Sequence, residues 1–159
     1  MTTSVCNLRP TSRGAVTLQG PDARTPPKID PNYLATEEDR AVASASLRHA
    51  RNIMATDAFA AFEPKEYFPG SELQSDAELA DAAGRIATSI FHPVGTCKMG
   101  PASDKTAVVN PKLQVHGVKR LRVADASIMP QITSGNTNSP TIMIAENAAI
   151  MILKDSSTH

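Results

Sequence analysis

The chain has 159 residues, of which 41% are hydrophobic, and its 16 basic side chains balance 16 acidic ones. This length suits about one domain and is enough to bury a hydrophobic core. Zero formal net charge and the lack of a lysine- or arginine-rich run argue against nucleic acid or an anionic membrane as a partner.

Membrane-spanning and metal-binding classes are disfavoured by the pattern of apolar residues and cysteines. The longest apolar stretch, residues 141–153, is interrupted by polar side chains and is too short to cross a bilayer. Residues 1–15 lack the apolar run of a secretory signal. Cys6 and Cys97 belong to no CxxC motif or Cys/His cluster. We therefore expect reduced thiols, no metal site and a cytoplasmic location, with peripheral membrane association left open.

The first third of the chain combines extended segments with one long helix. Residues 1–7 are expected to be disordered, and the proline-rich stretch 9–34 to be an extended edge segment with turns, because proline lacks a backbone donor. Thr36 followed by Asp39 is typical of a helix start. Apolar residues then recur at helical spacing, which predicts a helix over about 37–55.

A second helix follows an aromatic-rich segment that ends in a turn. Ser75 and Glu78 have capping-box spacing, and apolar residues continue at helical spacing as far as Ile90. The helix is expected to stop before Pro93, because the residue ahead of a proline is pushed out of the α region. Beyond it, short β-prone runs alternate with turns. These runs are 108–109, 113–115 and 121–124.

The last helix has the clearest local signal. Pro140 suits the first helical position, where its missing N–H costs nothing, and Ser139 is the expected N-cap. The first turn carries no acidic residue, so its positive end is free for an anion or an electron-rich ligand. Apolar side chains share one side of this helix: Ile142, Ala145, Ala149 and Ile152.

Among the four histidines, His92 is the strongest candidate for chemistry. It lies between Phe91 and Pro93, just after the second helix. Histidine changes charge near neutral pH and is therefore the usual general base. A loop histidine also commonly satisfies a backbone group and does nothing else, and the residues alone leave that alternative open.

Other candidates stand near the last helix and after the last β run. Asn136 and Asn138 precede the helix, where asparagine either lines a site or makes turns and caps. Asp125 would lie at the end of a strand, where α/β folds gather ligand contacts, or would simply form a turn. The glycines form no GxG pair, which excludes a GxGxxG motif, and GxSxG and HExxH are also missing.

Several ordered motifs give the chain a specific resemblance. HPVGTCKMG at 92–100, VVNPKLQVHGVKRLRVADASIMP at 108–130 and SGNTNSPTIMIAENAA at 134–149 resemble the C-terminal part of glucose-methanol-choline (GMC) oxidoreductases. In detail, the residues of these motifs most resemble those of the choline dehydrogenase and primary-alcohol dehydrogenase branch. LRPTSRGAVTL and PPKIDPNYL upstream resemble the same family's substrate-domain strands, so the likeness covers about residues 8–154.

The resemblance implies a flavoprotein with FAD as cofactor and a small-molecule alcohol as substrate. The fold class it implies is α+β, as a fragment of an α/β flavoprotein. Residues 8–90 would complete a substrate-binding domain with part of an antiparallel sheet and helices. Residues 91–154 would supply the active-site loop with a strand and the terminal helix of the FAD-binding domain, and residues 155–159 would be a tail.

The resemblance also implies roles for individual residues. His92 matches the family's catalytic histidine, and Asn136 matches a second active-site position that is His or Asn in different members. Further positions match segments that approach the flavin: Asp125, Ala126, Asn138, Ser139, Pro140, Thr141 and Ile142.

Simple chemistry agrees with these roles. Oxidising an alcohol to an aldehyde requires removal of the hydroxyl proton and transfer of a hydride from carbon to flavin N5. The imidazole of His92 can accept that proton, and such base catalysis is typically worth about 100- to 10,000-fold. The amide of Asn136 cannot titrate, but it can donate a hydrogen bond to the developing alkoxide.

A second interpretation stays open at this point. The chain has no counterpart of the family's glycine-rich phosphate loop. It is then either the C-terminal part of the enzyme, or a truncated, non-catalytic chain or subunit that needs a separate N-terminal FAD-binding fragment. An apolar helix face that normally packs on a sheet encoded elsewhere predicts aggregation or partner binding.

Overall fold

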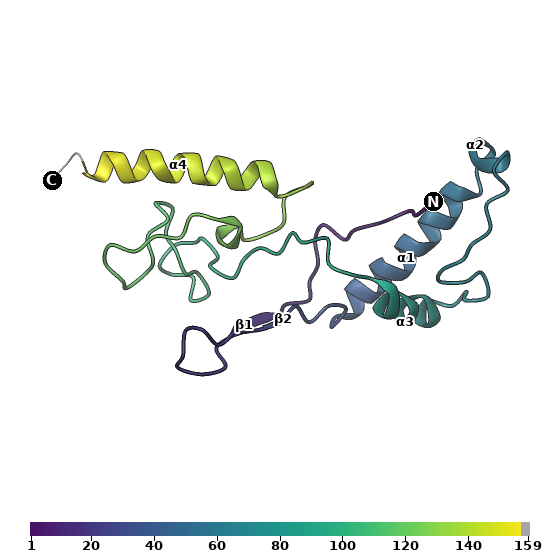
Figure 1. Ribbon diagram of the computed structural model, residues 1–159, viewed down its shortest axis with the longest axis horizontal. Coiled ribbons are helices and arrows are strands. Elements are labelled where there is room, and N and C mark those ends of the chain that lie inside the picture. The colour runs from purple at the N-terminus through teal and green to yellow at the C-terminus, as the bar shows by residue number, and fades with distance from the viewer. Residues whose placement is uncertain (157–159) are drawn as a thin grey trace. The chain divides into compact units, whose positions relative to one another are not determined.

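The computed structural model describes residues 1–156 and shows two compact units, Met1–Ile90 and the part from Phe91 onward. Figure 1 labels their helices and strands. Both units combine helices with extended chain, and the first contains a small antiparallel sheet. The expected α+β class is confirmed. Of the expected tail, residues 157–159 lie outside the described part.

The sheet of the first unit is a short exposed hairpin. Strands β1 (Ala15–Thr17) and β2 (Lys28–Asp30) pair antiparallel, with Val16 opposite Ile29. All residues of both strands are exposed. The expectation of an extended edge segment is confirmed, because neither strand is covered within this unit.

Three helices follow the hairpin: α1 (Glu37–Met54), α2 (Asp57–Ala60) and α3 (Asp76–Ile86). The side chain of Thr36 caps α1 by accepting a hydrogen bond from the Asp39 N–H. Ser75 and Glu78 form a complete capping box at the start of α3. Both predicted starts are confirmed, because capping depends on residues only three positions apart.

The second helix stops before Pro93, as predicted, but it does not reach Ile90. α3 ends at Ile86, and Ala87 is already extended with ψ 153°. Ile90, expected on the apolar face of the helix, is therefore outside it and is exposed. Apolar spacing continues past the helix because it is a property of side chains, whereas the break occurs in the backbone.

The core of the first unit lies between α1 and α3, which pack against each other. Leu79 is fully buried, and small side chains surround it on α3, which allows the helices to approach closely. Ser44 of α1 is also buried, and its hydroxyl donates to the Ala41 carbonyl at 3.0 Å. The buried alanines of α3 are Ala80, Ala82 and Ala83.

The second unit contains the larger hydrophobic core. Between residues 97 and 124 the chain forms isolated bridges, such as Met99 with Val109, in place of the expected β runs. A short 3-10 helix η1 (Ala126–Ile128) and the long helix α4 (Asn138–Ser156) pack together. The buried core residues are Val109, Leu113, Ile128, Met129, Ile144 and Ala148.

Helix α4 begins earlier than its sequence indicates. Its first residue is Asn138, so Ser139 is inside the helix and the predicted N-cap at Ser139 was wrong. Pro140 is tolerated because N–H groups throughout the first turn have no partner within the helix. The side that carries Ile142 and Ile152 is exposed, whereas the core takes the side of Ile144.

Candidate functional site

His92 lies in a loop at the start of the second unit, where the backbone turns sharply. Phe91 before it has φ 62° and Gly95 after it has φ 89°. Non-glycine residues rarely adopt positive φ, and such positions gather at functional sites. His92 itself is partly buried. The backbone on both sides of His92 is therefore in an unfavourable conformation, and contacts with the surrounding structure must stabilise it.

The imidazole of His92 is hydrogen-bonded to a threonine that lies 45 positions further along the chain. Nδ1 of His92 lies 2.8 Å from Oγ1 of Thr137. Thr137 is buried, with 6% of its surface exposed. The hydrogen-bond partner of Nδ1 is thus a side chain and not a backbone group. The alternative that His92 only satisfies a backbone group therefore does not apply to this nitrogen.

Thr137 was not among the residues predicted from the sequence, where attention fell on its neighbours. The sequence pointed to Asn136 and Asn138 on either side and indicated Ser139 as the helix cap. The available signal was a hydroxyl residue just before an apolar helix, which is a typical capping position. That signal would have marked Thr137 as structural but would not have connected it with His92.

The position of Asn136 is also tied to the contact between Thr137 and His92, because Asn136 immediately precedes Thr137 in the chain. Asn136 is exposed, and no hydrogen bond joins it to His92 within residues 1–156. The segment that carries Asn136 is nevertheless fixed beside the imidazole through Thr137. Asn136 is thus next in sequence to the residue that holds His92, and its side chain is exposed.

The beginning of α4 presents unused backbone donors. The Thr141 N–H and its hydroxyl both donate to the Thr137 carbonyl, at 3.0 and 2.7 Å. Within residues 1–156, the backbone N–H groups of Asn138 and Ser139 donate to no acceptor. The first turn has no acidic residue. This end of the helix is therefore electropositive and suited to an electron-rich ligand.

Asp125 acts locally as a cap. Its carboxylate accepts a hydrogen bond from the Ser127 N–H at 2.8 Å and so begins η1. In the described part of the chain no strand leads directly into Asp125, because residues 121–124 form only an isolated bridge at Arg122. The turn-forming alternative therefore describes the Asp125 side chain, while Ala126 beside it is partly buried in the same turn.

Backbone hydrogen bonds hold the histidine loop against η1. The Cys97 N–H donates to the Ser127 carbonyl at 3.0 Å, and the Met99 N–H donates to the Ile128 carbonyl at 2.8 Å. Together with the Thr137 contact, these bonds bring three predicted segments together in one unit: 92–100, 125–130 and 134–142.

An ion pair stabilises the loop that follows. Nζ of Lys98 lies 2.7 Å from Oδ2 of Asp104 and donates to the Thr106 hydroxyl at 2.6 Å. Hydrogen bonds from Lys98 and Thr106 hold the pKa of the Asp104 carboxyl well below its usual range. Asp104 therefore stays ionised over the pH range in which a histidine changes charge.

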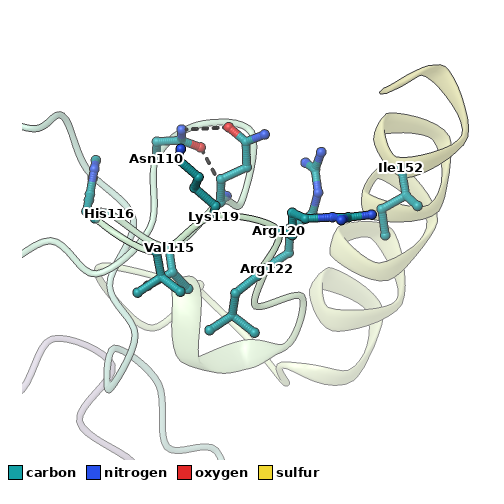
Figure 2. Close-up of a pocket in the computed structure, with 11 residues that line it drawn as sticks. Asn110, Val115, His116, Lys119, Arg120, Arg122 and Ile152 are labelled. Atoms are coloured by element: carbon teal, nitrogen blue, oxygen red, sulfur yellow. Dashed lines mark hydrogen bonds between the residues drawn. The ribbon is translucent and has the colours of Figure 1, made fainter. Parts of the chain in front are cut away.

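A groove of about 680 Å³ lies next to the C-terminal half of α4, away from the predicted residues. Figure 2 shows Lys119, Arg120 and Arg122 around it, with Ile152 contributed by the helix. Arg122 is paired with Asp155 of α4. None of the site residues predicted from the sequence lines this groove, so its basic side chains are separate from the His92 loop.

Two further classes of site are not found among residues 1–156. No group of three or more His, Cys, Asp or Glu side chains is placed to hold a metal ion. No helix in this part of the chain has the length and apolar character needed to span a membrane.

The segments gathered around His92 match a known family. The profile described as GMC oxidoreductase matches residues 10–145, which cover the hairpin, the histidine loop and the start of α4. The chain therefore belongs to the GMC oxidoreductase family, and it matches the C-terminal part of that family.

Curated relatives agree with this assignment. The chain is 46% identical over 153 residues to alcohol dehydrogenase (acceptor) from Pseudomonas putida, covering 96% of this chain and 27% of that protein. It is 49% identical over 148 residues to mitochondrial choline dehydrogenase from Mus musculus, covering 93% and 25%. The chain thus spans about a quarter of the length of the curated relatives it matches.

Solved structures share the fold. Pyridoxine 4-oxidase from Mesorbium loti superposes with a TM-score of 0.83 at 37% identity, over 96% of this chain and 28% of that one. An FAD-dependent oxidoreductase from Chaetomium thermophilum superposes with a TM-score of 0.87 at 30% identity, over 94% and 26%. These similarities cover 94–96% of the chain.

Proposed function

We propose that this chain is the C-terminal part of an FAD-dependent oxidoreductase that oxidises a CH–OH group to the aldehyde, with His92 as general base. The observation that carries the proposal is the placement of His92, held by Thr137 beside Asn136 and the open start of α4. Family membership and the alcohol and choline dehydrogenases among the relatives support it.

The residues at the start of α4 fit the electron-rich edge of a flavin. Asn138 and Ser139 offer two backbone donors, and no acidic side chain in the first turn opposes negative charge there. Such a helix end favours an anion by about 0.3–1 kcal/mol, and by more when partly buried. Residues that would contact FAD are Asp125, Ala126 and Asn138 to Ile142, the first two through the η1 turn. When bound, FAD supplies the hydride acceptor.

The remaining steps belong to side chains of this chain. Nε2 of His92 accepts the proton of the substrate hydroxyl, since Nδ1 is occupied by Thr137. The amide of Asn136 donates a hydrogen bond to the oxygen as negative charge develops on it. Neither role requires a metal or a covalent intermediate.

The same proposal assigns the two units and the location of the protein. Residues 8–90 belong to the substrate-binding domain, and residues 91–154 to the active-site loop and FAD-binding domain. Residues 1–7 and 155–159 are terminal segments. A cytoplasmic location, with peripheral membrane association left open, is supported by Cys6 and Cys97, which are both free thiols.

Substitution of His92 tests the assignment directly. In a protein completed by an N-terminal FAD-binding part and loaded with FAD, His92→Ala should slow flavin reduction by alcohol about 100- to 10,000-fold, because the base is removed, while FAD stays bound. Stopped-flow absorbance measures the rate. His49→Ala, at an exposed position of α1, is the matched control and should reduce flavin at the normal rate. Near-normal reduction by His92→Ala would refute the assignment.

A second candidate function is that of a subunit that is non-catalytic alone and needs a separate N-terminal FAD-binding fragment. The observation that favours it is the exposed apolar side of α4, where Ile142, Ile150 and Leu153 are each about half exposed or more. Apolar surface of this kind typically belongs to an interface. The two candidates differ in what the chain does without another polypeptide.

A further inference from the structure

Thr137 combines features that an ordinary helix cap does not require. Its side chain is 6% exposed, and within residues 1–156 its hydroxyl has one hydrogen-bond partner, Nδ1 of His92 at 2.8 Å. The partner lies 45 positions away in the chain. A buried hydroxyl whose hydrogen bond goes to a distant side chain restricts how that side chain can turn.

The backbone of Thr137 is held in place from the other side. Its carbonyl accepts from both the N–H and the hydroxyl of Thr141, so the first turn of α4 determines its position. The histidine loop is tied to η1 by the Cys97 and Met99 N–H groups. Both ends of the Thr137–His92 contact are therefore anchored in the same hydrophobic core.

We propose that Thr137 is a positioning residue that accepts a hydrogen bond from Nδ1–H of His92 and so keeps the imidazole lone pair on Nε2. This inference rests on the proposed function, in which His92 acts as the base. Neutral imidazole has an N–H on one nitrogen and a lone pair on the other. A hydroxyl can accept a hydrogen bond from the first kind of nitrogen or donate one to the second. The proposed base role sets the direction of this bond, because a lone pair on Nε2 requires the ring proton on Nδ1 and Thr137 as its acceptor.

Only one of the two arrangements is compatible with base catalysis at Nε2. If the Thr137 hydroxyl donated to Nδ1, the ring proton would sit on Nε2, and that nitrogen could not accept the substrate proton. If Nδ1–H donates to Thr137, Nε2 accepts the proton from the substrate hydroxyl and the ring becomes an imidazolium. The hydroxyl oxygen can still accept from Nδ1–H in that state, so the contact persists when the base carries the substrate proton.

The test distinguishes the effect of the Thr137 hydroxyl group from the effect of the shape of its side chain. Thr137→Val keeps the shape and removes the hydroxyl, whereas Thr137→Ser keeps the hydroxyl and serves as the control. The protein is labelled with ¹⁵N-histidine, and His92→Gln identifies the His92 signals by their loss. The ¹⁵N shifts of the ring nitrogens then report which one carries the proton, independently of catalysis.

We expect Nδ1–H in the wild-type protein and in Thr137→Ser, and an increased share of Nε2–H in Thr137→Val. In the completed, FAD-loaded protein, Thr137→Val should lower the rate of flavin reduction roughly three- to tenfold, the change that one neutral hydrogen bond accounts for. Thr137→Ser should recover most of that rate. Substrate binding, measured by the concentration that gives half the maximal rate, should stay unchanged.

Each contrary outcome has a distinct meaning. Predominant Nε2–H in the wild-type protein overturns the inference even if Thr137→Val fails to fold. An unchanged tautomer in folded Thr137→Val overturns it as well. Near-normal flavin reduction by His92→Ala refutes the proposed function instead, whatever the NMR spectra show.

Discussion

At the scale of single residues, the geometry around His92 depends on unusual backbone angles. Phe91 and Gly95 both have positive φ, and they stand on either side of the histidine. A side chain at Gly95 would also meet the Met129 carbonyl oxygen at 3.4 Å. Because Met129 belongs to the core, the turn at Gly95 links the position of the loop to core packing.

Gly95→Ala should therefore destabilise the second unit by roughly 1–2 kcal/mol, the cost of a left-handed conformation for a residue with a side chain. Urea-dependent pulse labelling of Cys97, which is partly buried in this unit, measures the change by mass spectrometry. Gly20→Ala is the control, since no atom lies within 4 Å of a Cβ there. Equal labelling profiles for the two variants would contradict the role of the turn.

Some residues of the candidate site could be predicted from the sequence and others could not. His92 and Asn136 could be selected because motif and chemistry are local properties. Thr137 could not be connected with His92, because their contact spans 45 positions and exists only in the folded chain. For Asp125, the local alternative of a turn former describes the side chain.

At the scale of elements, the first turn of α1 holds the N-terminal segment through one buried carboxylate. Asp39 is 4% exposed and accepts hydrogen bonds from the Thr11 and Ser12 N–H groups at 2.9 and 2.8 Å. The Asn7 amide donates to the same carboxylate at 3.1 Å. Burial raises the pKa of Asp39, but hydrogen bonds from Ser12 and Thr11 outweigh it, so that the pKa is lowered.

A lowered pKa in the folded state gives stability that is complete above the unfolded pKa of about 3.9 and is lost as pH falls through the folded value. Asp39→Asn should thus cost about 1–3 kcal/mol near pH 7 and progressively less in acid, because the ionised acceptor is already lost there. Urea unfolding followed by tyrosine fluorescence reports on this unit, since both tyrosines, Tyr33 and Tyr67, belong to it.

Glu37→Gln provides the matched control, because Glu37 is an exposed acid in the same first turn of α1. Its loss removes a favourable interaction with the helix dipole, worth about 0.3–1 kcal/mol. If Asp39→Asn were no more destabilising than Glu37→Gln near neutral pH, the carboxylate would not anchor residues 7–12.

At the scale of the whole molecule, one helix carries apolar side chains on two sides. Ile144 and Ala148 of α4 belong to the core, whereas Ile150 is 49% exposed. The sequence indicated the helix but not its buried side, because apolar residues occur nearly all round it. The exposed side is the observation behind the second candidate function, in which another polypeptide covers it.

The purified 159-residue chain, mixed with FAD and desalted, should retain no flavin absorbance, because it has no GxGxxG segment to bind the cofactor phosphates. Adding a separately produced polypeptide that corresponds to the preceding part of a GMC oxidoreductase should restore retention of flavin. Ile150→Glu should weaken that restoration at least severalfold, since it places a charge in the apolar side of α4.

Ile29→Glu makes the same change at a residue of β2 that is 68% exposed and should leave the restoration unaffected. Stoichiometric flavin on the chain alone would contradict the need for the second polypeptide. Equal effects of the two substitutions would show that the exposed side of α4 is not the contact surface.

The sequence by itself determined the helix starts at Thr36 and Ser75, the family and the candidates His92 and Asn136. Those features depend on residues close together in the chain, through capping, spacing and motif chemistry. Only the tertiary structure decided that Thr137 meets His92, that Asp39 is buried and that α4 turns Ile144 inward. These outcomes arise from contacts between distant segments, whose geometry is set by how the core packs and not by local preference.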